Sequence, residues 1–261
     1  MSVLIKIIGF LLACVAFTVP AKQFAIVIDD IGNHQRDLEL LSLPGGVTFS
    51  ILPHTPYSQQ FAFAASRQQR ELLLHIPMQA KDPEKALGPG ALTSEMEKWQ
   101  LQMTLGNALS TLPQVKGVNN HMGSALTEQI EPMKWTMEIL KKRSLYFLDS
   151  RTTSQSQAQH AANLYGVKNI ARQVFLDNDV SEAALNKQWQ YMLQLLENHE
   201  QVIIIAHPYP ETAAFLARKL AEVGSKNAQL VPVSQLVEQK YVRLAEIAEQ
   251  HAISGQLRLQ E

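Results

Sequence analysis

The chain reads Phe24-Ala25-Ile26-Val27-Ile28-Asp29-Asp30 near its start, an apolar run that ends in two adjacent carboxylates. A short run without polar alternation predicts a strand that is buried on both faces. Two like charges in a site partly shielded from water raise a pKa unless a cation or hydrogen-bond donors offset them. The stretch therefore predicts both a buried strand and a functional site at its end.

Similar apolar runs recur along the chain and alternate with amphipathic segments. Those with Ser or Thr ahead of acidic residues have the N-cap and first-turn charge that favour a helix. Strands are predicted at residues 24–28, 47–52, 72–76, 115–118, 145–148, 170–175, 202–206 and 229–233, and helices at 94–112, 131–142 and 181–198. This alternation predicts an α/β fold with a parallel sheet and covering helices. Periodicity alone does not distinguish an open sheet from a closed barrel.

Length and composition agree with one large α/β domain. The chain has 261 residues, of which 46% are hydrophobic and 18% are charged, and its formal net charge is −1. An α/β barrel commonly takes about 250 residues. A net charge so close to zero gives no sign of the basic surface that binds nucleic acid or an anionic membrane. A neutral or zwitterionic substrate such as a glycan is compatible with it.

The first 21 residues are predicted to be a signal peptide. One early cation is followed by an apolar run over residues 7–19 and then by Val19-Pro20-Ala21. This order is typical of secretory signals, and the run is shorter than the roughly 20 residues of a comfortable membrane span. A buried first helix and a membrane anchor are the alternatives. We expect export, to the periplasm in a Gram-negative cell, with no stable membrane span after cleavage.

The single cysteine limits the residues that could form disulfides or bind a metal. Cys14 is the only cysteine, and Leu12 stands where a lipoprotein signal needs a small residue. After cleavage the mature chain has no thiol and no disulfide. Any metal site must therefore use His, Asp or Glu.

The organisation after the signal is predicted to be one domain over residues 22–237, followed by a helical tail over 238–261. Residues 81–93, with two prolines and two glycines, are predicted to form a long loop. We find no internal repeat and no low-complexity linker.

Titratable and polar residues gather where the predicted strands end. Taken singly, a histidine after an apolar run is more often structural, and an aspartate is often an N-cap. Chance would scatter such residues over both edges of the sheet, whereas the carboxyl ends of parallel strands meet on one face. The residues concerned are Asp29-Asp30, His54, His75, Asn119-Asn120-His121, Asp149, Asp177 and His207. Among them, His75, His121 and one carboxylate could form a two-His, one-carboxylate zinc site with positions left for water.

Five stretches of this chain resemble the divergent polysaccharide deacetylase family. They are Ile28-Asp29-Asp30-Ile31-Gly32, His75-Ile76-Pro77-Met78, Asn119-Asn120-His121-Met122-Gly123-Ser124, Leu148-Asp149-Ser150-Arg151 and Ala206-His207-Pro208. The family is a distant branch of the carbohydrate esterases with a NodB-like barrel, and the resemblance covers roughly residues 24–237. It implies an irregular (β/α) barrel of about seven parallel strands with outer helices.

The resemblance also implies roles for individual residues. Asp29 is the expected general base, His207 the general acid, and Asp30 and His75 are metal ligands. The second histidine of the parent deacetylases falls on Gln79 here, so His121 is the expected substitute ligand. Side chains expected to contact substrate or to orient these groups are Asn120, Asp149, Arg151, Arg172 and Asp177. Arg172 and Asp177 could also pair with each other across neighbouring strand ends.

The leading functional hypothesis is a metal-dependent hydrolase, with zinc the expected ion, that removes N-acetyl groups from a cell-envelope polysaccharide. A second hypothesis, suggested by Gln79, is a degenerate barrel that binds a glycan or an envelope protein without catalysis. A third keeps the fold and the metal but cleaves another amide or an ester.

Overall fold

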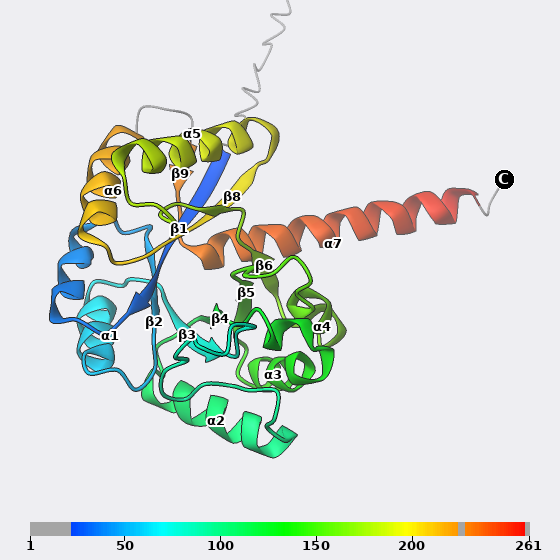
Figure 1. Ribbon diagram of the computed structural model, residues 1–261. Helices are drawn as coiled ribbons and strands as arrows, with labels where there is room; N and C mark the ends of the chain where they lie inside the picture. The colour runs from blue at the N-terminus through cyan, green and yellow to red at the C-terminus, as the bar shows by residue number, and fades with distance from the viewer. Residues whose placement is uncertain (1–21, 224–227, 259–261) are drawn as a thin grey trace, which may run out of the picture.

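The computed structural model describes residues 22–223 and 228–258 (Figure 1). The predicted signal peptide, residues 1–21, lies outside these ranges. No helix within them is long and apolar enough to cross a membrane.

The described residues form one parallel sheet of nine strands that is surrounded by helices (Figure 1). The strands are β1 (Lys22–Ile31), β2 (Thr48–Ile51), β3 (Leu72–Met78), β4 (Gly117–Met122), β5 (Tyr146–Asp149), β6 (Asn169–Ala171), β7 (Val174–Phe175), β8 (Gln201–Ala206) and β9 (Ala228–Leu230). Their order is β6-β5-β4-β3-β2-β1-β8-β7, and β9 pairs with the beginning of β1. The predicted parallel α/β architecture is confirmed.

A single stretch of chain closes the sheet into an irregular barrel. Residues 170–175, predicted as one strand, are broken at Arg172 and Gln173 into β6, which pairs with β5, and β7, which pairs with β8. The backbone N–H of Arg172 still bonds to the Asp149 carbonyl, and that of Gln173 bonds to the Ile203 carbonyl. The chain thus steps from one edge of the curled sheet to the other. The barrel prediction is confirmed. The sheet has nine strands where about seven were expected, and this break accounts for one of the additional strands.

Three strands run further than the apolar pattern predicted. β1, β3 and β4 were expected to end near residues 28, 76 and 118, but the β3–β4 ladder continues from the His75–Asn119 pair to the Met78–Met122 pair. Backbone pairing does not depend on side-chain polarity, so the ladder extends through the polar residues. The site residues on these strands are therefore held by the sheet and not by loops.

Helices cover the outside of the sheet (Figure 1). They are α1 (Ser58–Arg67), α2 (Lys98–Thr111), α3 (Ile130–Lys142), α4 (Ala158–Leu164), α5 (Glu182–Asn198), α6 (Pro210–Val223) and α7 (Val233–Arg258), with the 3-10 helices η1 (Gln35–Ser42) and η2 (Leu126–Glu128). The predicted N-cap of α5 is present, because Ser181 Oγ accepts from the Ala184 N–H. α2 begins four residues later than predicted, because the Ser94 hydroxyl bonds to Gln79 and Glu97 takes the N-cap position.

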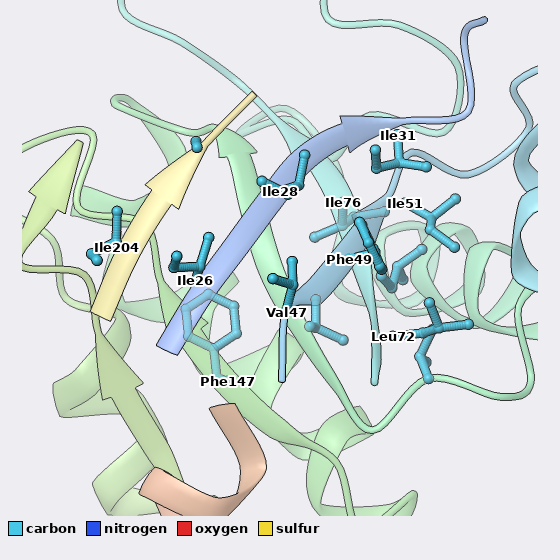
Figure 2. Packing of buried hydrophobic residues seen from close by; sticks show 14 of the residues in the cluster. Ile26, Ile28, Ile31, Val47, Phe49, Ile51, Leu72, Ile76, Phe147 and Ile204 are labelled. Carbon is cyan, nitrogen blue, oxygen red and sulfur yellow. The ribbon is translucent and has the colours of Figure 1, made fainter. Parts of the chain in front are cut away.

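The two faces of β1 serve two apolar layers, because side chains alternate along a strand. Ile26 and Ile28 face outward into a core shared with the helices, whereas Ala25 and Val27 face the barrel interior. Figure 2 shows the outer layer, with Ile26, Ile28, Ile31, Val47, Phe49, Ile51, Leu72, Ile76, Phe147 and Ile204 labelled. The interior layer is made of strand residues, of Val231 after β9, and of Val233, Leu236 and Val237 from α7.

Helix α7 closes the barrel at the end opposite the carboxyl ends of the strands. Its first turn is bound there by buried acceptors, since the Val233 N–H donates to Thr48 Oγ1 and the Ser234 N–H donates to Glu71 Oε1. The strand predicted at 229–233 ends at Leu230, because Pro232 has no N–H to donate to the ladder and Val233 begins the helix. The predicted domain boundary between residues 237 and 238 falls inside α7, which then extends away from the barrel (Figure 1).

Gly32 is required where the chain leaves β1. Its φ of +118° disfavours side chains, and a Cβ there would lie 2.4 Å from Thr55 Oγ1. We expect Gly32→Ala to lower the free energy of unfolding by about 1–3 kcal/mol, measured by denaturant titration. Gly45→Ala is the matched control, because nothing lies within 4 Å of the position that its Cβ would occupy. Equal destabilisation by the two substitutions would contradict the prediction.

Candidate functional site

A polar layer caps the apolar barrel interior at the carboxyl ends of the strands. The inward positions that carry Val27 and Leu73 are followed, two residues on, by Asp29 and His75. The same alternation turns Ser50 and Asn119 inward from β2 and β4, and all four polar side chains are buried. Buried polar groups must find partners, so the side chains of this layer have to bind one another or a ligand.

A bulge in β1 lets both adjacent carboxylates face the same site. In a regular strand Asp29 and Asp30 would point to opposite faces of the sheet. The pairing of β1 with β2 shifts register between Ile28 and Ile31, and Asp30 has a φ of +59°. The left-handed conformation costs about 1–3 kcal/mol for a residue with a side chain, and such strain gathers at functional sites. His54, Met122 and Arg151, near the ends of β2, β4 and β5, also have positive φ.

Asp30, His75 and His121 come together from three strands, β1, β3 and β4. One potential ligand atom from each lies within 4.8 Å of the others. Asp30 Oδ1 is 3.1 Å from His75 Nε2 and 2.8 Å from His121 Nδ1. Burial raises the pKa of Asp30, but the two imidazoles outweigh it and hold that pKa well below its usual value. The carboxylate is therefore ionised throughout the physiological range.

The geometry of this cluster fits a cation. Asp30 Oδ1 is buried, and no described residue directs a well-formed hydrogen bond to it although two ring nitrogens are close. An orphaned buried carboxylate oxygen is costly unless a positive charge satisfies it. Two imidazoles and one carboxylate are a known zinc-binding set that leaves open positions. These three residues could therefore hold a divalent metal.

Asn119 connects the two groups on either side of it. Its Nδ2 donates to Asp29 Oδ1 at 2.8 Å, which fixes the orientation of the carboxamide because a carboxylate only accepts. Its Oδ1 lies 2.8 Å from His75 Nδ1 and also accepts from the Ser50 hydroxyl. His75 Nδ1 must then carry a proton, so in the neutral imidazole the lone pair lies on Nε2, the nitrogen that is near Asp30. Sequence reasoning gave Asn119 no role, although its inward register beside His75 was the available signal.

The hydrogen bond between His75 and Asn119 leads to a testable prediction. Asn119→Ala removes the acceptor that selects the His75 tautomer, and we expect zinc affinity to fall about 10–100-fold in a competition titration with a chromophoric chelator. Asn119→Asp keeps an acceptor at the same place and is expected to keep most of the affinity. The same loss in both variants would contradict the tautomer explanation.

His207 faces the cluster from the end of β8 and is paired with Asp177. Its Nδ1 is 2.9 Å from Asp177 Oδ1, while the other carboxylate oxygen accepts from the His207 N–H and from the Thr212 hydroxyl. Burial lowers the pKa of His207, but Asp177, with help from Asp29 and Asp30, raises it to about 9. At neutral pH the imidazole is therefore protonated and able to donate.

The pairing of His207 with Asp177 is testable by NMR. In metal-free protein we expect the His207 ring to titrate near pH 9, and in Asp177→Asn to titrate more than about one unit lower. Because the folded-state pKa exceeds the usual value near 6.5, this proton stabilises the fold below about pH 6.5, and the stabilisation is lost as pH rises through about 9. An unchanged titration in Asp177→Asn would show that the carboxylate is not the cause. Exposed His160, on α4, is the internal reference.

Comparison with known proteins bears on this arrangement. Residues 26–237 match the model of a family described as divergent polysaccharide deacetylase. The chain belongs to this family. It is similar to the uncharacterized protein YibQ of Escherichia coli K12, with 33% identity over 85% of this chain and 69% of that one. It is equally similar to an uncharacterized Haemophilus influenzae protein, with 33% identity over 85% of this chain and 79% of that one.

A crystal structure supports the fold of this divergent deacetylase family member. The uncharacterized protein ATU2773 of Agrobacterium tumefaciens C58 superposes with a TM-score of 0.78 at 24% identity, covering 83% of this chain and 89% of that one. At this identity the likeness concerns the fold alone. The resemblance to the divergent deacetylases and their barrel is thus confirmed.

Gln79 has a structural role in this divergent deacetylase chain, and its carboxamide binds Ser94 and Glu95 instead of the cluster of Asp30, His75 and His121. Its Oε1 accepts from the Ser94 N–H at 2.7 Å and from the Ser94 hydroxyl. Its backbone bonds to Leu92 and accepts from Ala125 and Leu126. Gln79 therefore fastens the ends of the long loop over 80–93 to β3 and to the loop after β4. His121 is the second imidazole of the cluster instead.

The remaining predicted residues form a supporting frame. Asn120 joins β4 to the start of the loop after β5, since its Oδ1 accepts from the Ser150 N–H. Buried Asp149 accepts from the Arg151 N–H. The expected Arg172–Asp177 pair is wrong: Arg172 donates to the carbonyls of Ser150 and Arg151, and Asp177 binds His207. Asp29, which Asp149 and Arg151 were expected to orient, receives its side-chain hydrogen bond from Asn119.

A small cavity of about 180 Å³ lies beside the cluster. Asp30 and His121 line it on one side, and most of its other lining residues are apolar. These include Leu52, Pro53, Pro77, Leu87 and Pro89. Leu87 and Pro89 belong to the loop predicted over 81–93, so this loop forms one wall of the site.

Proposed function

We propose that this protein is a metal-dependent hydrolase that removes N-acetyl groups from a cell-envelope polysaccharide. The observation that carries the proposal is the convergence of Asp30, His75 and His121 beside the buried carboxylate of Asp29. A binding module has no evident need for a second carboxylate next to a metal set. Zinc is the proposed ion, held by those three side chains.

A divalent cation at this set supplies Lewis acidity, which polarises an acetyl carbonyl and lowers the pKa of water. Asp29 is the proposed general base. Its Oδ1 is occupied by Asn119, whereas Oδ2 lies 3.6 Å from His75 Nε2 and is the oxygen that faces the cluster. Burial raises the pKa of Asp29, which increases its strength as a base once it is ionised.

His207 is the proposed general acid. β1 and β8 pair in register at Ile28 and Ala206, so Asp29 and His207 follow on neighbouring strands. The Asp177 carboxylate occupies His207 Nδ1, which leaves Nε2 to donate a proton to the departing amine. The apolar cavity beside Asp30 and His121 has the size and polarity to accept the methyl of an acetyl group.

Gln79 is the observation that favours a second candidate function. A chain that has glutamine where the parent deacetylases have their second histidine could bind a glycan or an envelope protein without hydrolysing it. Cleavage of another amide or an ester is the third candidate, because the same groups serve any acyl transfer to water. Acetate release separates these candidates.

The test uses purified mature protein with zinc added and with zinc removed by a chelator. We expect one zinc per chain and acetate release from N-acetylglucosamine oligomers only in the zinc-loaded sample. Absence of stoichiometric metal would overturn the metal-dependent proposal. Zinc and oligomer binding without acetate release would favour the binding module, and activity confined to O-acetyl substrates would favour the esterase.

We also propose that the protein is exported, to the periplasm in a Gram-negative cell. The apolar run over residues 7–19 with its small-residue exit supports this proposal. N-terminal sequencing of protein recovered from the host should begin at Lys22. An intact Met1 would contradict cleavage.

A further inference from the structure

A groove runs along the outside of the barrel where the sheet is closed by the short strands β6 and β7. Its volume is about 630 Å³, within the usual range for ligand sites. Its lining includes Gln159 of α4, Tyr191 of α5 and two arginines, Arg151 and Arg172. The step from β6 to β7 contains no helix, so the covering layer is open at this point.

The two arginines of this groove have charges that the described residues leave without a direct partner. Neither guanidinium has a carboxylate within 4.0 Å in the described ranges, although Arg218 on α6 is paired with Glu182. Arg172 donates to two backbone carbonyls, and Arg151 donates to Gln159 Oε1. One carboxylate, that of buried Asp149, also lines the groove and accepts from the Arg151 N–H. Two arginines against one aspartate leave the lining with a formal net charge of +1, which favours an anion.

The groove also has the features of a sugar site. The Tyr191 side chain is 47% exposed, so its ring is available to stack against the apolar face of a sugar. The hydroxyl groups of Ser154 and Ser156 also line the groove and can bind sugar hydroxyls. Two further polar residues of the lining are engaged inside the protein, since the Thr153 hydroxyl donates to Glu128 and the Gln159 amide donates to Asn169. A small inorganic anion would make no stacking contact with the Tyr191 ring.

Phe175 lies between the groove and the proposed general acid. The Arg172 guanidinium lies 3.8 Å from the centre of the Phe175 ring. The His207 imidazole also stacks with the Phe175 ring. The angle between the two ring planes is 19°, and the ring centres are 6.0 Å apart. A ligand bound at Arg172 is therefore adjacent to the site where the acetyl group would be cleaved.

We propose that this groove binds a carboxylate-bearing sugar of the glycan, a neighbour of the sugar that is deacetylated. Arg151 and Arg172 bind the carboxylate, and Tyr191 stacks against the ring. The inference rests on the proposed function, which places the glycan beside the groove. Binding of the sugar in the groove itself requires neither metal nor catalysis.

The test therefore measures binding to metal-free protein. Two tetrasaccharides serve as probes: one of N-acetylglucosamine alone, and one in which N-acetylglucosamine alternates with glucuronate. We expect the acidic probe to bind at least about tenfold more tightly at low salt, as a charge-assisted hydrogen bond requires. Arg151→Gln and Tyr191→Ala should each remove most of this preference or affinity. Both residues are partly exposed, so these variants should fold even if Arg172→Gln does not.

Arg218→Gln is the matched control, an exposed arginine outside the groove, and it should bind both probes like the wild type. Equal affinity for the two tetrasaccharides would overturn the groove assignment. So would unchanged binding in Arg151→Gln and Tyr191→Ala, or binding of free glucuronate as tight as that of the acidic probe. Failure of acetate release with a positive result here would overturn the proposed function and leave the groove in place.

Discussion

Asp30→Ala is expected to abolish stoichiometric zinc binding, reducing the metal content from one per chain to nearly none. Asp30 Oδ1 is the atom that both imidazoles approach, at 3.1 and 2.8 Å. Its removal leaves His75 and His121 without the anionic ligand of the set. Loss of a direct ligand should exceed the roughly 10–100-fold effect that is typical of outer partners. Metal analysis after dialysis and competition titration measure the change.

The controls for this prediction test the composition of the ligand set. His75→Ala and His121→Ala should resemble Asp30→Ala, because each contributes one ligand atom. Gln79→Ala should keep its zinc, since its carboxamide is bound to Ser94. Loss of zinc in Gln79→Ala but not in His121→Ala would show that the second imidazole has been assigned wrongly.

Asp29→Asn is expected to reduce acetate release by about 10²–10⁴-fold while zinc remains bound. The substitution keeps the shape of the side chain and its neighbour Asn119 but removes the charge that accepts a proton. Asp29 is buried, and its Oδ1 is held at 2.8 Å by Asn119, so the geometry should change little. Steady-state acetate release at saturating zinc measures the effect.

Two comparisons make this second prediction specific. Metal analysis of Asp29→Asn must still find one zinc per chain, because loss of metal would make the rate uninformative about the base. Asp37→Asn is a matched control, a buried aspartate whose carboxylate accepts from the Gly32 N–H instead of facing the cluster. Activity in Asp29→Asn within a few-fold of that of the control would contradict the role of Asp29 as base.

The secondary structure was largely predictable because its signals are local. The apolar runs that predicted strands at residues 24–28 and 202–206 lie in β1 and β8, which pair side by side. The break at Arg172 and Gln173 could not be predicted, because it depends on how far the sheet curls before its two edges meet. A helix was predicted from residue 238 on, but its start at Val233 was missed, since the polarity change at 238 reflects where the helix leaves the barrel.

The site was predictable in position but not in its connections. The sequence placed Asp29, His75, His121 and His207 on one edge, since parallel strands bring their carboxyl ends together. It gave no role to Asn119, whose two hydrogen bonds depend on the register of β3 against β4. It paired Arg172 with Asp177, although the structure pairs Asp177 with His207.

The sequence by itself determined the approximate positions of the strands, the family and the edge of the barrel at which the polar residues gather. These follow from the order and polarity of neighbouring residues, which the chain carries whatever its final shape. Only the tertiary structure decided that Asp30 turns toward His75 and His121, through a bulge and a positive φ. Only the tertiary structure decided that a groove lies near Phe175, because the curl of the sheet sets where its two edges meet.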